Sequence, residues 1–207
     1  MTAAVHAFVS GLGTGAGLIV AIGAQNAHVL RLSILRSFVI PTVAVCIVVD
    51  AVLISIGVSG TGAILLVFPS LRTWMSLIGA AYIFWYGIRA FHRAITADGS
   101  LVAASESLPK TAGGAVVVAL AFSLLNPHVY LDTVALLGAI SAAWPPYIRP
   151  WFGSGAATAS ILWFSALGFA GSYLGPVFAK PVAWKVFDAT VALIMFTITG
   201  ALLHGLF

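Results

Sequence analysis

The sequence predicts an all-α integral membrane protein whose six transmembrane helices form two inverted three-helix repeats. Hydrophobic residues make up 61% of the 207 residues and charged residues 7%, whereas a typical soluble domain is about 25% charged. Apolar runs of about 20 residues, the length of a helix that crosses a bilayer, recur along the chain. Three runs lie on each side of one polar segment, residues 96–110. These observations together indicate a membrane protein with two similar halves.

Six apolar blocks follow one another, and each ends at a short polar segment or at a cluster of glycine and proline. The blocks cover residues 4–30, 37–60, 72–92, 112–141, 151–175 and 181–206. Aromatic residues typical of the membrane–water interface lie near several block ends. They are Trp74, Trp144, Tyr147, Trp151 and Trp184. The first block lacks the basic start of a signal peptide, so we expect it to remain as the first span.

These blocks predict one transmembrane domain over residues 1–207, with a first three-helix repeat at 1–95 and a second at 112–207. The polar segment 96–111 between them is predicted to be a cytoplasmic connecting loop. Because each half has an odd number of spans, the two halves would insert in opposite orientations. Inverted repeats of this kind are a common architecture of secondary transporters.

The basic residues predict the orientation of the chain. If the chain starts outside, seven Lys and Arg residues fall at the cytoplasmic side and two at the outer side. The cytoplasmic set is Arg31, Arg36, Arg89, Arg93, Lys110, Lys180 and Lys185, and the outer set is Arg72 and Arg149. Cytoplasmic loops are enriched in Lys and Arg, so both termini are predicted to lie outside. The same scattering argues against a nucleic-acid-binding groove, in which basic residues cluster.

Two acidic residues, Asp50 and Asp132, lie inside apolar blocks. A charged side chain at the centre of a membrane helix costs roughly 2.5–3.5 kcal/mol and normally faces the bundle interior or a water-filled path. We therefore expect both aspartates to bind or move a cation or a proton. The alternative is that each makes a structural hydrogen bond between helices.

The first and fourth blocks are too long for one straight span, and each has a polar interruption. At about 1.5 Å per residue each would exceed roughly 40 Å, so we expect each to kink or break. The first block would break at Gly23, Gln25 and Asn26, and the fourth at Asn126 and Pro127. Asparagine is a good N-cap and proline favours the first helical position, so a half-helix beginning at Pro127 would present free N–H groups to an anion. The alternative is a simple proline kink.

The two aspartates differ in the partners that their own helices offer. Asp132 follows His128 by four residues, so the two side chains would share a helix face and could share a proton. No such partner lies one turn from Asp50, and its partner is expected to come from another helix. The polar candidates near membrane depth are Gln25, Asn26, Asn126 and His128.

Several other residues have ordinary explanations. Four alternate glycines near the start of the chain are Gly11, Gly13, Gly15 and Gly17. No strand precedes them and no phosphate-binding lysine follows, so we expect them to let helices pack closely. Cys46, the single cysteine, is expected to be buried packing, and His28 either lines the same cavity as Gln25 or simply ends its helix. No cluster has metal-ligand spacing, and no cofactor is predicted.

Five segments resemble the LysE/ArgO family of lysine and arginine exporters. They are Ile22-Gly-Ala-Gln-Asn26, Val45-Cys-Ile-Val-Val-Asp50, Gly79-Ala-Ala-Tyr-Ile-Phe-Trp85, Leu125-Asn-Pro-His-Val-Tyr-Leu-Asp132 and Ala159-Ser-Ile-Leu-Trp-Phe164. The resemblance covers nearly the whole chain and departs at Ala24, where many members have proline. It implies export of L-lysine or L-arginine across the bacterial cytoplasmic membrane, driven by an ion gradient rather than by ATP.

These residues predict a secondary-active exporter that exchanges protons for its substrate. The two aspartates would be neutralised alternately by cargo and proton, while the amide side chains and the helix terminus at Pro127 would hold the amino-acid backbone. The predicted substrate- and proton-binding residues are Gly23, Gln25, Asn26, Asp50, Asn126, Pro127, His128, Tyr130 and Asp132.

The predicted partners are L-lysine or L-arginine, protons as coupling ion, and the lipid bilayer, without nucleic acid. Sodium coupling and a homo-oligomer stay open. One rival function is export of a metal ion or another small cation, against which stands the lack of a third acid or of Cys and Met ligands. The other is an intramembrane aspartyl protease. The second aspartate of such enzymes usually follows Gly-x-Gly, and neither Asp50 nor Asp132 does.

Overall fold

The computed structural model describes residues 2–20, 23–60, 69–96, 109–126 and 129–204. In order, its elements are α1 (Thr2–Ile19), α2 (Ala24–Ile34), α3 (Val39–Val58), α5 (Pro69–Thr96), α7 (Ala112–Leu124), the π-helix η1 (Tyr130–Leu136), α9 (Leu137–Ser141), α10 (Arg149–Phe178) and α11 (Pro181–His204). No strand occurs in the described ranges, and this confirms the predicted all-α class.

The first apolar block is interrupted, as its polar residues predict. α1 ends at Ile19 and α2 begins at Ala24, with Gly23 as an extended N-cap (φ −127°, ψ 179°). The Nδ2 atom of Asn26 donates a hydrogen bond of 2.9 Å to the carbonyl oxygen of Ile19. This bond satisfies one of the carbonyl groups that the end of α1 leaves without an intrahelical partner. The interruption therefore forms with alanine, not proline, at position 24.

The fourth apolar block is interrupted as well. The side chain of Thr111 caps the start of α7 by accepting a hydrogen bond of 3.0 Å from the backbone N–H of Gly114. α7 ends at Leu124, and the chain resumes as η1 and then α9. π-Helical turns are rare in proteins, and those that do occur are often found at functional sites. Pro127 and His128, where a half-helix is predicted to begin, lie outside the described residues.

The interruptions change the predicted set of spans. Among the described residues, four helices are both long and apolar enough to cross a membrane: α1, α3, Arg149–Gly171 of α10, and α11. α5 has 28 residues but carries Arg89, His92 and Arg93 in its last turns. α2 and α7 have only 11 and 13 residues. Six complete spans in an inverted repeat therefore stay a prediction.

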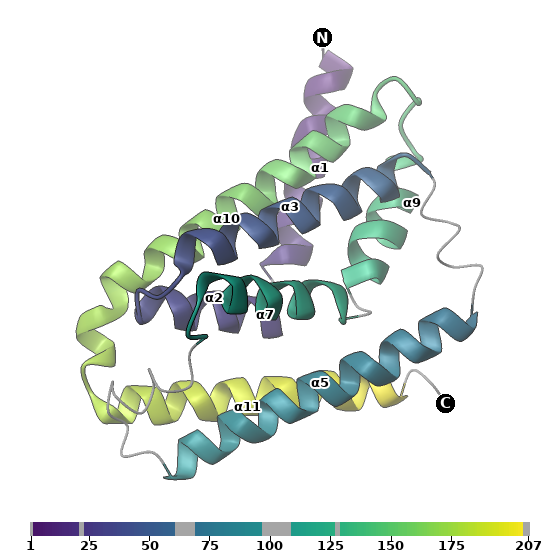
Figure 1. Ribbon diagram of the computed structural model, residues 1–207. Helices are drawn as coiled ribbons and strands as arrows, with labels where there is room; N and C mark the ends of the chain where they lie inside the picture. Colours follow the sequence, from purple (N-terminus) through teal and green to yellow (C-terminus); the bar gives the residue numbers. More distant parts are fainter. Residues whose placement is uncertain (1, 21–22, 61–68, 97–108, 127–128, 205–207) are drawn as a thin grey trace.

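The broken helix of each half packs on an unbroken helix of the other half. α1 and α2 both pack on α10, whereas α7, η1 and α9 pack on α3. α3 and α10 lie side by side, and α5 and α11 form a second pair below them in Figure 1. α1 is steeply inclined to α10 in the same view. The halves are thus interleaved rather than separate.

Glycines allow two of these contacts to be close. A Cβ atom at Gly11 would collide with the backbone of Phe152, and one at Gly15 would lie 2.9 Å from the Cα atom of Ala156. On the other side of the bundle, a Cβ atom at Gly57 would lie 2.7 Å from the carbonyl oxygen of Thr133. The packing role predicted for Gly11 and Gly15 is confirmed. At Gly13 and Gly17 a Cβ atom would meet nothing within 4 Å.

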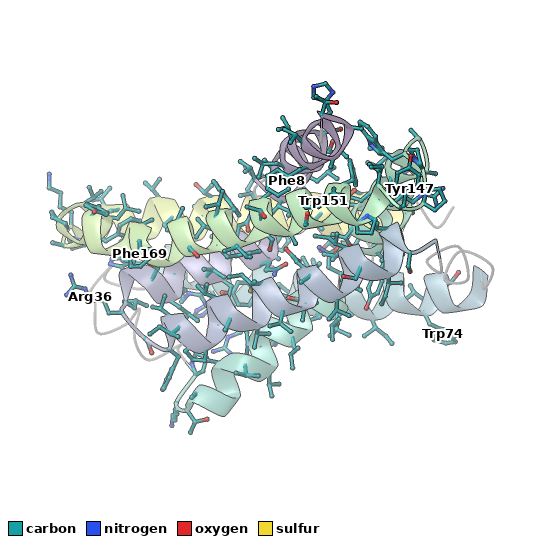
Figure 2. The ribbon with its side chains drawn as sticks, turned by 90° about the horizontal axis from the view of Figure 1, so that it is seen from above. Phe8, Arg36, Trp74, Tyr147, Trp151 and Phe169 are labelled. Carbon is teal, nitrogen blue, oxygen red and sulfur yellow. The ribbon has the colours of Figure 1, made fainter. Side chains whose placement is uncertain are left out.

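The outer surface is apolar, with polar and aromatic residues at the ends. Ile40 on α3 is 83% exposed, as suits a side chain that faces lipid rather than water. In Figure 2 the exposed aromatic side chains of Trp74, Tyr147 and Trp151 lie toward one end of the long helices, and Arg36 lies toward the opposite end. Phe169, which is 71% exposed, lies toward the same end as Arg36 in this view, so exposed aromatic side chains lie toward both ends, as expected at two membrane interfaces.

Candidate functional site

Asp50 is buried in the middle of α3, as its place in an apolar block predicts, with only 4% of its surface exposed. The Oγ atom of Ser160 on α10 donates a hydrogen bond of 2.7 Å to the carboxylate of Asp50. In the described part of the chain, no lysine or arginine forms an ion pair with Asp50. A carboxylate in this position therefore has a neutral partner and still requires a proton or a cation to balance its charge.

Polar groups from two more helices surround the same level of α3. The side chains of Gln25 on α2 and Ser123 on α7 lie near the thiol of Cys46, which precedes Asp50 by one turn. The Nε2 atom of Gln25 is buried and has no hydrogen-bond partner among the described residues. Cys46 is buried, as expected, and packs in an apolar cluster with Val29, Ala119 and Phe164. The four helices α2, α3, α7 and α10 thus meet at Asp50.

Asp132 lies in η1 at a different level of the bundle. The backbone N–H of Leu137 bonds to the carbonyl oxygen of Asp132, five residues earlier, which is the π-helical pattern. η1 packs on α3 around Gly57, against the carbonyl oxygen of Thr133. Gly57 follows Asp50 by seven residues, or about 10 Å along the helix axis. The two aspartates therefore lie at different levels along α3.

Two hydrogen bonds join the start of η1 to the end of α7 and to Asn126. The N–H of Val129 donates to the carbonyl oxygen of Asn126 at 3.2 Å, and the hydroxyl of Tyr130 donates to the carbonyl oxygen of Leu124 at 3.0 Å. Tyr130 thereby satisfies a carbonyl group at the end of α7. The predicted contact between His128 and Asp132 cannot be described, because His128 lies outside the described residues.

α2 carries a row of polar side chains. Gln25, His28 and Arg31 follow one another at a spacing of three, so each is a neighbour of the next, while the row winds by about 60° per step around the helix. His28 is buried against the rings of Phe122 and Tyr86, with centroids 5.2 and 6.3 Å away. Neither ring nitrogen of His28 has a hydrogen-bond partner among the described residues. Buried polar groups are normally paired, so the unpartnered groups of α2 are unusual.

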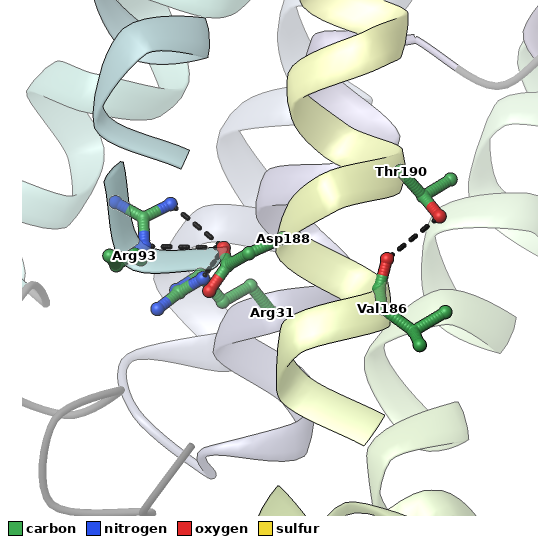
Figure 3. A network of polar contacts seen from close by, with 5 residues as sticks. All are labelled: Arg31, Arg93, Val186, Asp188 and Thr190. Carbon is green, nitrogen blue, oxygen red and sulfur yellow. Dashed lines mark hydrogen bonds and ion pairs between the residues drawn. The ribbon is translucent and has the colours of Figure 1, made fainter. Parts of the chain in front are cut away.

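A buried ion network, which the sequence pattern does not predict, lies at the end of this row (Figure 3). The Nη1 atom of Arg31 on α2 lies 2.5 Å from the Oδ1 atom of Asp188 on α11. The Nε and Nη2 atoms of Arg93 on α5 donate to the same oxygen at 3.2 and 3.0 Å. The guanidinium group of Arg31 also lies over the ring of Trp184, 5.5 Å from its centroid. One carboxylate thus joins three helices.

Sequence reasoning missed this network for a simple reason. From the sequence alone, Arg31 and Arg93 are interpreted as residues that set the membrane orientation, and Asp188 is not identified as a candidate site residue. The signal that identifies Asp50 also applies to Asp188, because it is an acidic residue inside the apolar block 181–206. Ser160 was missed as well, since a serine in an apolar helix is common and only packing shows its partner. Among the described residues, no three His, Cys, Asp or Glu side chains group as metal ligands do.

Comparison with known proteins gives a consistent assignment. The profile of the family described as LysE type translocator matches residues 16–205. The protein named "Putative amino-acid transporter Rv0488" of Mycobacterium tuberculosis is 43% identical over 176 residues, which cover 85% of this chain and 86% of the relative. The arginine exporter protein ArgO of Photorhabdus laumondii is 34% identical over 195 residues, or 94% of each chain. That of Serratia proteamaculans is 35% identical over 191 residues, covering 92% of this chain and 93% of the relative. No solved structure matches the chain at a significant level.

Proposed function

The chain belongs to the LysE family of translocators, and from this membership we propose that it is a secondary-active exporter of basic L-amino acids. The proposed cargo is L-lysine, L-arginine or both, and the proposed location is the bacterial cytoplasmic membrane. Two relatives that match over more than 90% of the chain are named arginine exporters. The cationic cargo of those relatives fits the chemistry of a buried carboxylate.

The observation that carries the proposal is Asp50. Its carboxylate is buried, accepts a hydrogen bond from the neutral hydroxyl of Ser160, and pairs with no cation in the described part of the chain. Burying such a charged group in a membrane protein costs free energy unless a ligand neutralises it. A guanidinium or ammonium group of the cargo and a proton are two species that can do so in turn.

Proton antiport is the proposed energy source. Exporting a monocation against an inside-negative potential costs about 2.3 kcal/mol per 100 mV. One proton moving inward for each cation moving outward would cancel the transported charge. Asp50 and Asp132, which lie at different levels along α3, are the proposed carriers of cargo and proton.

The amide groups at the two interruptions are proposed to bind the amino-acid backbone. Gln25 supports this role, because its buried Nε2 donor has no partner among the described residues. Asn126 follows the C-cap of α7 at the second interruption, and the segment that begins at Pro127 would supply N–H groups for a carboxylate. Interrupted helices recur at the substrate sites of secondary transporters.

The proposed orientation places both termini outside and the end of α2 inside. Arg36, at that end, lies opposite the end marked by Trp74 and Tyr147 in Figure 2. α1 and α2 of the first half pack on α10 of the second half, whereas α7, η1 and α9 of the second half pack on α3 of the first half. This reciprocal packing supports an inverted repeat. Under this arrangement the network of Asp188 lies near the cytoplasm.

Counterflow in proteoliposomes tests the proposal directly. Vesicles loaded with unlabelled L-arginine or L-lysine should accumulate the labelled amino acid, whereas vesicles loaded with L-leucine should not. Asp132→Asn should insert normally and lose coupled export. If the purified chain exchanges neither basic amino acid but does exchange another small cation, the proposed cargo is wrong.

A further inference from the structure

We propose that Asp188 is a second binding site for the cationic group of the cargo, and that Arg93 occupies this site when cargo is absent. The inference rests on the proposed function, since it takes a basic amino acid as the cargo. It adds a site about two helical turns from the cluster around Gln25 and Asp50, at the end of the bundle where α2, α5 and α11 meet.

The chemistry of the site matches the proposed cargo. The Oδ1 atom of Asp188 accepts hydrogen bonds from two guanidinium groups, those of Arg31 and Arg93. A guanidinium group is the side-chain terminus of arginine itself. In the described part of the chain, Arg31, Arg93 and Asp188 together carry two positive charges and one negative charge. Replacing one guanidinium by that of the cargo keeps this charge, and the freed arginine can then bind the cargo's carboxylate.

Arg93 is the more exchangeable of the two arginines. The side chain of Arg31 is 3% exposed, sits over Trp184 and reaches Asp188 at 2.5 Å. The side chain of Arg93 is 14% exposed, lies near the end of α5 and reaches Asp188 at 3.0 Å. Removing Arg93 from the carboxylate also leaves the pair of Arg31 and Asp188 intact.

The polar row on α2 connects this site with Asp50. His28 lies one turn from Arg31, and Gln25 lies one turn further, next to Cys46. Both ring nitrogens of His28 and the Nε2 atom of Gln25 are buried without partners among the described residues. Steps of three residues are about 4.5 Å along a helix, so these groups are spaced for a cargo that moves from one carboxylate to the next.

Binding to the purified full chain tests the inference, with L-arginine and agmatine as probes. Agmatine is arginine without its carboxylate. It therefore competes with Arg93 for Asp188, but it has no carboxylate that the displaced Arg93 side chain could bind. In an Asp50→Asn background, which removes the first site, saturable binding of both probes should persist. Adding Arg93→Gln should tighten agmatine binding roughly fivefold and should reduce the preference for L-arginine over agmatine.

Arg89→Gln is the matched control. Arg89 lies one turn before Arg93 on α5, and its guanidinium group lies over Trp85, 5.1 Å from the ring centroid. This variant removes the same charge from the same helix but should leave agmatine affinity unchanged. An increase in affinity of the same size in both variants would show a general charge effect and would overturn the site.

Asp188→Asn should abolish the residual binding in the Asp50→Asn background. Because this change leaves two arginines without their carboxylate and can prevent folding, the Arg93→Gln result decides the question if the variant is not monodisperse. If the wild-type chain exchanges basic amino acids but Arg93→Gln leaves the selectivity between the two probes unchanged, the second site is wrong and the proposed function stands. If the wild-type chain binds neither basic amino acid, the proposed function itself fails.

Discussion

The hydroxyl of Ser160 on α10 donates a 2.7 Å hydrogen bond to the carboxylate of Asp50 on α3, and this buried contact joins the two halves of the chain. α3 belongs to the first half and α10 to the second. A group that bridges the halves can respond when one half moves relative to the other, as alternating access requires. Under the proposed function, a change in the charge of Asp50 would therefore be felt at the contact between the two halves.

Asp50→Asn is expected to abolish export while leaving the protein folded. Asparagine keeps the volume of the side chain and can still accept the hydrogen bond from Ser160, but it has no charge to neutralise a cation or to take up a proton. Uptake of labelled L-arginine into loaded proteoliposomes measures the effect, and size-exclusion chromatography in detergent checks the fold. Wild-type exchange by a monodisperse Asp50→Asn protein would remove Asp50 from the mechanism.

Ser160→Ala should weaken export without abolishing it. The change removes the donor but keeps the carboxylate, and leaving a buried polar group unsatisfied costs about 1–3 kcal/mol. Ser154→Ala is the control, because the hydroxyl of Ser154 on the same helix is exposed and bonds to the backbone carbonyl oxygen of Trp151 rather than to a charged group. Thermal unfolding and exchange rates should both change for Ser160→Ala and stay at wild-type values for Ser154→Ala. Equal effects of the two variants would argue that Ser160 has no special role.

Gly11→Val should destabilise the bundle, and Gly13→Val should not. A Cβ atom at Gly11 would collide with the carbonyl group of Phe152, whereas one at Gly13 would meet no atom within 4 Å. Overpacking of a close contact typically costs about 1–3 kcal/mol. Because both variants place the same β-branched residue in α1, the helix propensity cancels in the comparison. A similar loss of thermal stability in both proteins would contradict the close contact between α1 and α10.

The orientation of the chain is open to a direct test. Reporters fused to the two ends should both indicate the periplasmic side, because seven of the nine basic residues fall on the other side in this orientation. Alkaline phosphatase is active only outside the cytoplasm, and a fluorescent protein that folds only inside it provides the opposite signal. A cytoplasmic N-terminus with a periplasmic C-terminus would mean that one apolar block does not cross the membrane completely.

Features that depend on local sequence could be predicted, and features that depend on long-range packing could not. Gly23 marks the first interruption because the polar residues Gln25 and Asn26 follow shortly after it and because glycine can cap a helix. Asp50 is expected to be buried because a long apolar block surrounds it. Its partner Ser160 is 110 residues away, and nothing in the sequence specifies which faces of α3 and α10 meet. The network of Asp188 and Arg93 is missed for the same reason, since α5 and α11 are distant in sequence.

Electroneutral exchange is the sharpest test of the energy source. If one proton enters for each monovalent cargo molecule that leaves, the transported charges cancel, so the membrane potential does no net work on the cycle. A pH gradient alone, with the potential clamped at zero by potassium and valinomycin, should then drive uphill movement of L-arginine in proteoliposomes. An imposed potential without a pH gradient should drive none, although about 2.3 kcal/mol per 100 mV acts on any uncompensated charge. Transport driven by a sodium gradient and unaffected by the pH gradient would eliminate proton antiport, while leaving the roles of Asp50 and Asp132 in binding the cargo to be tested by the variants.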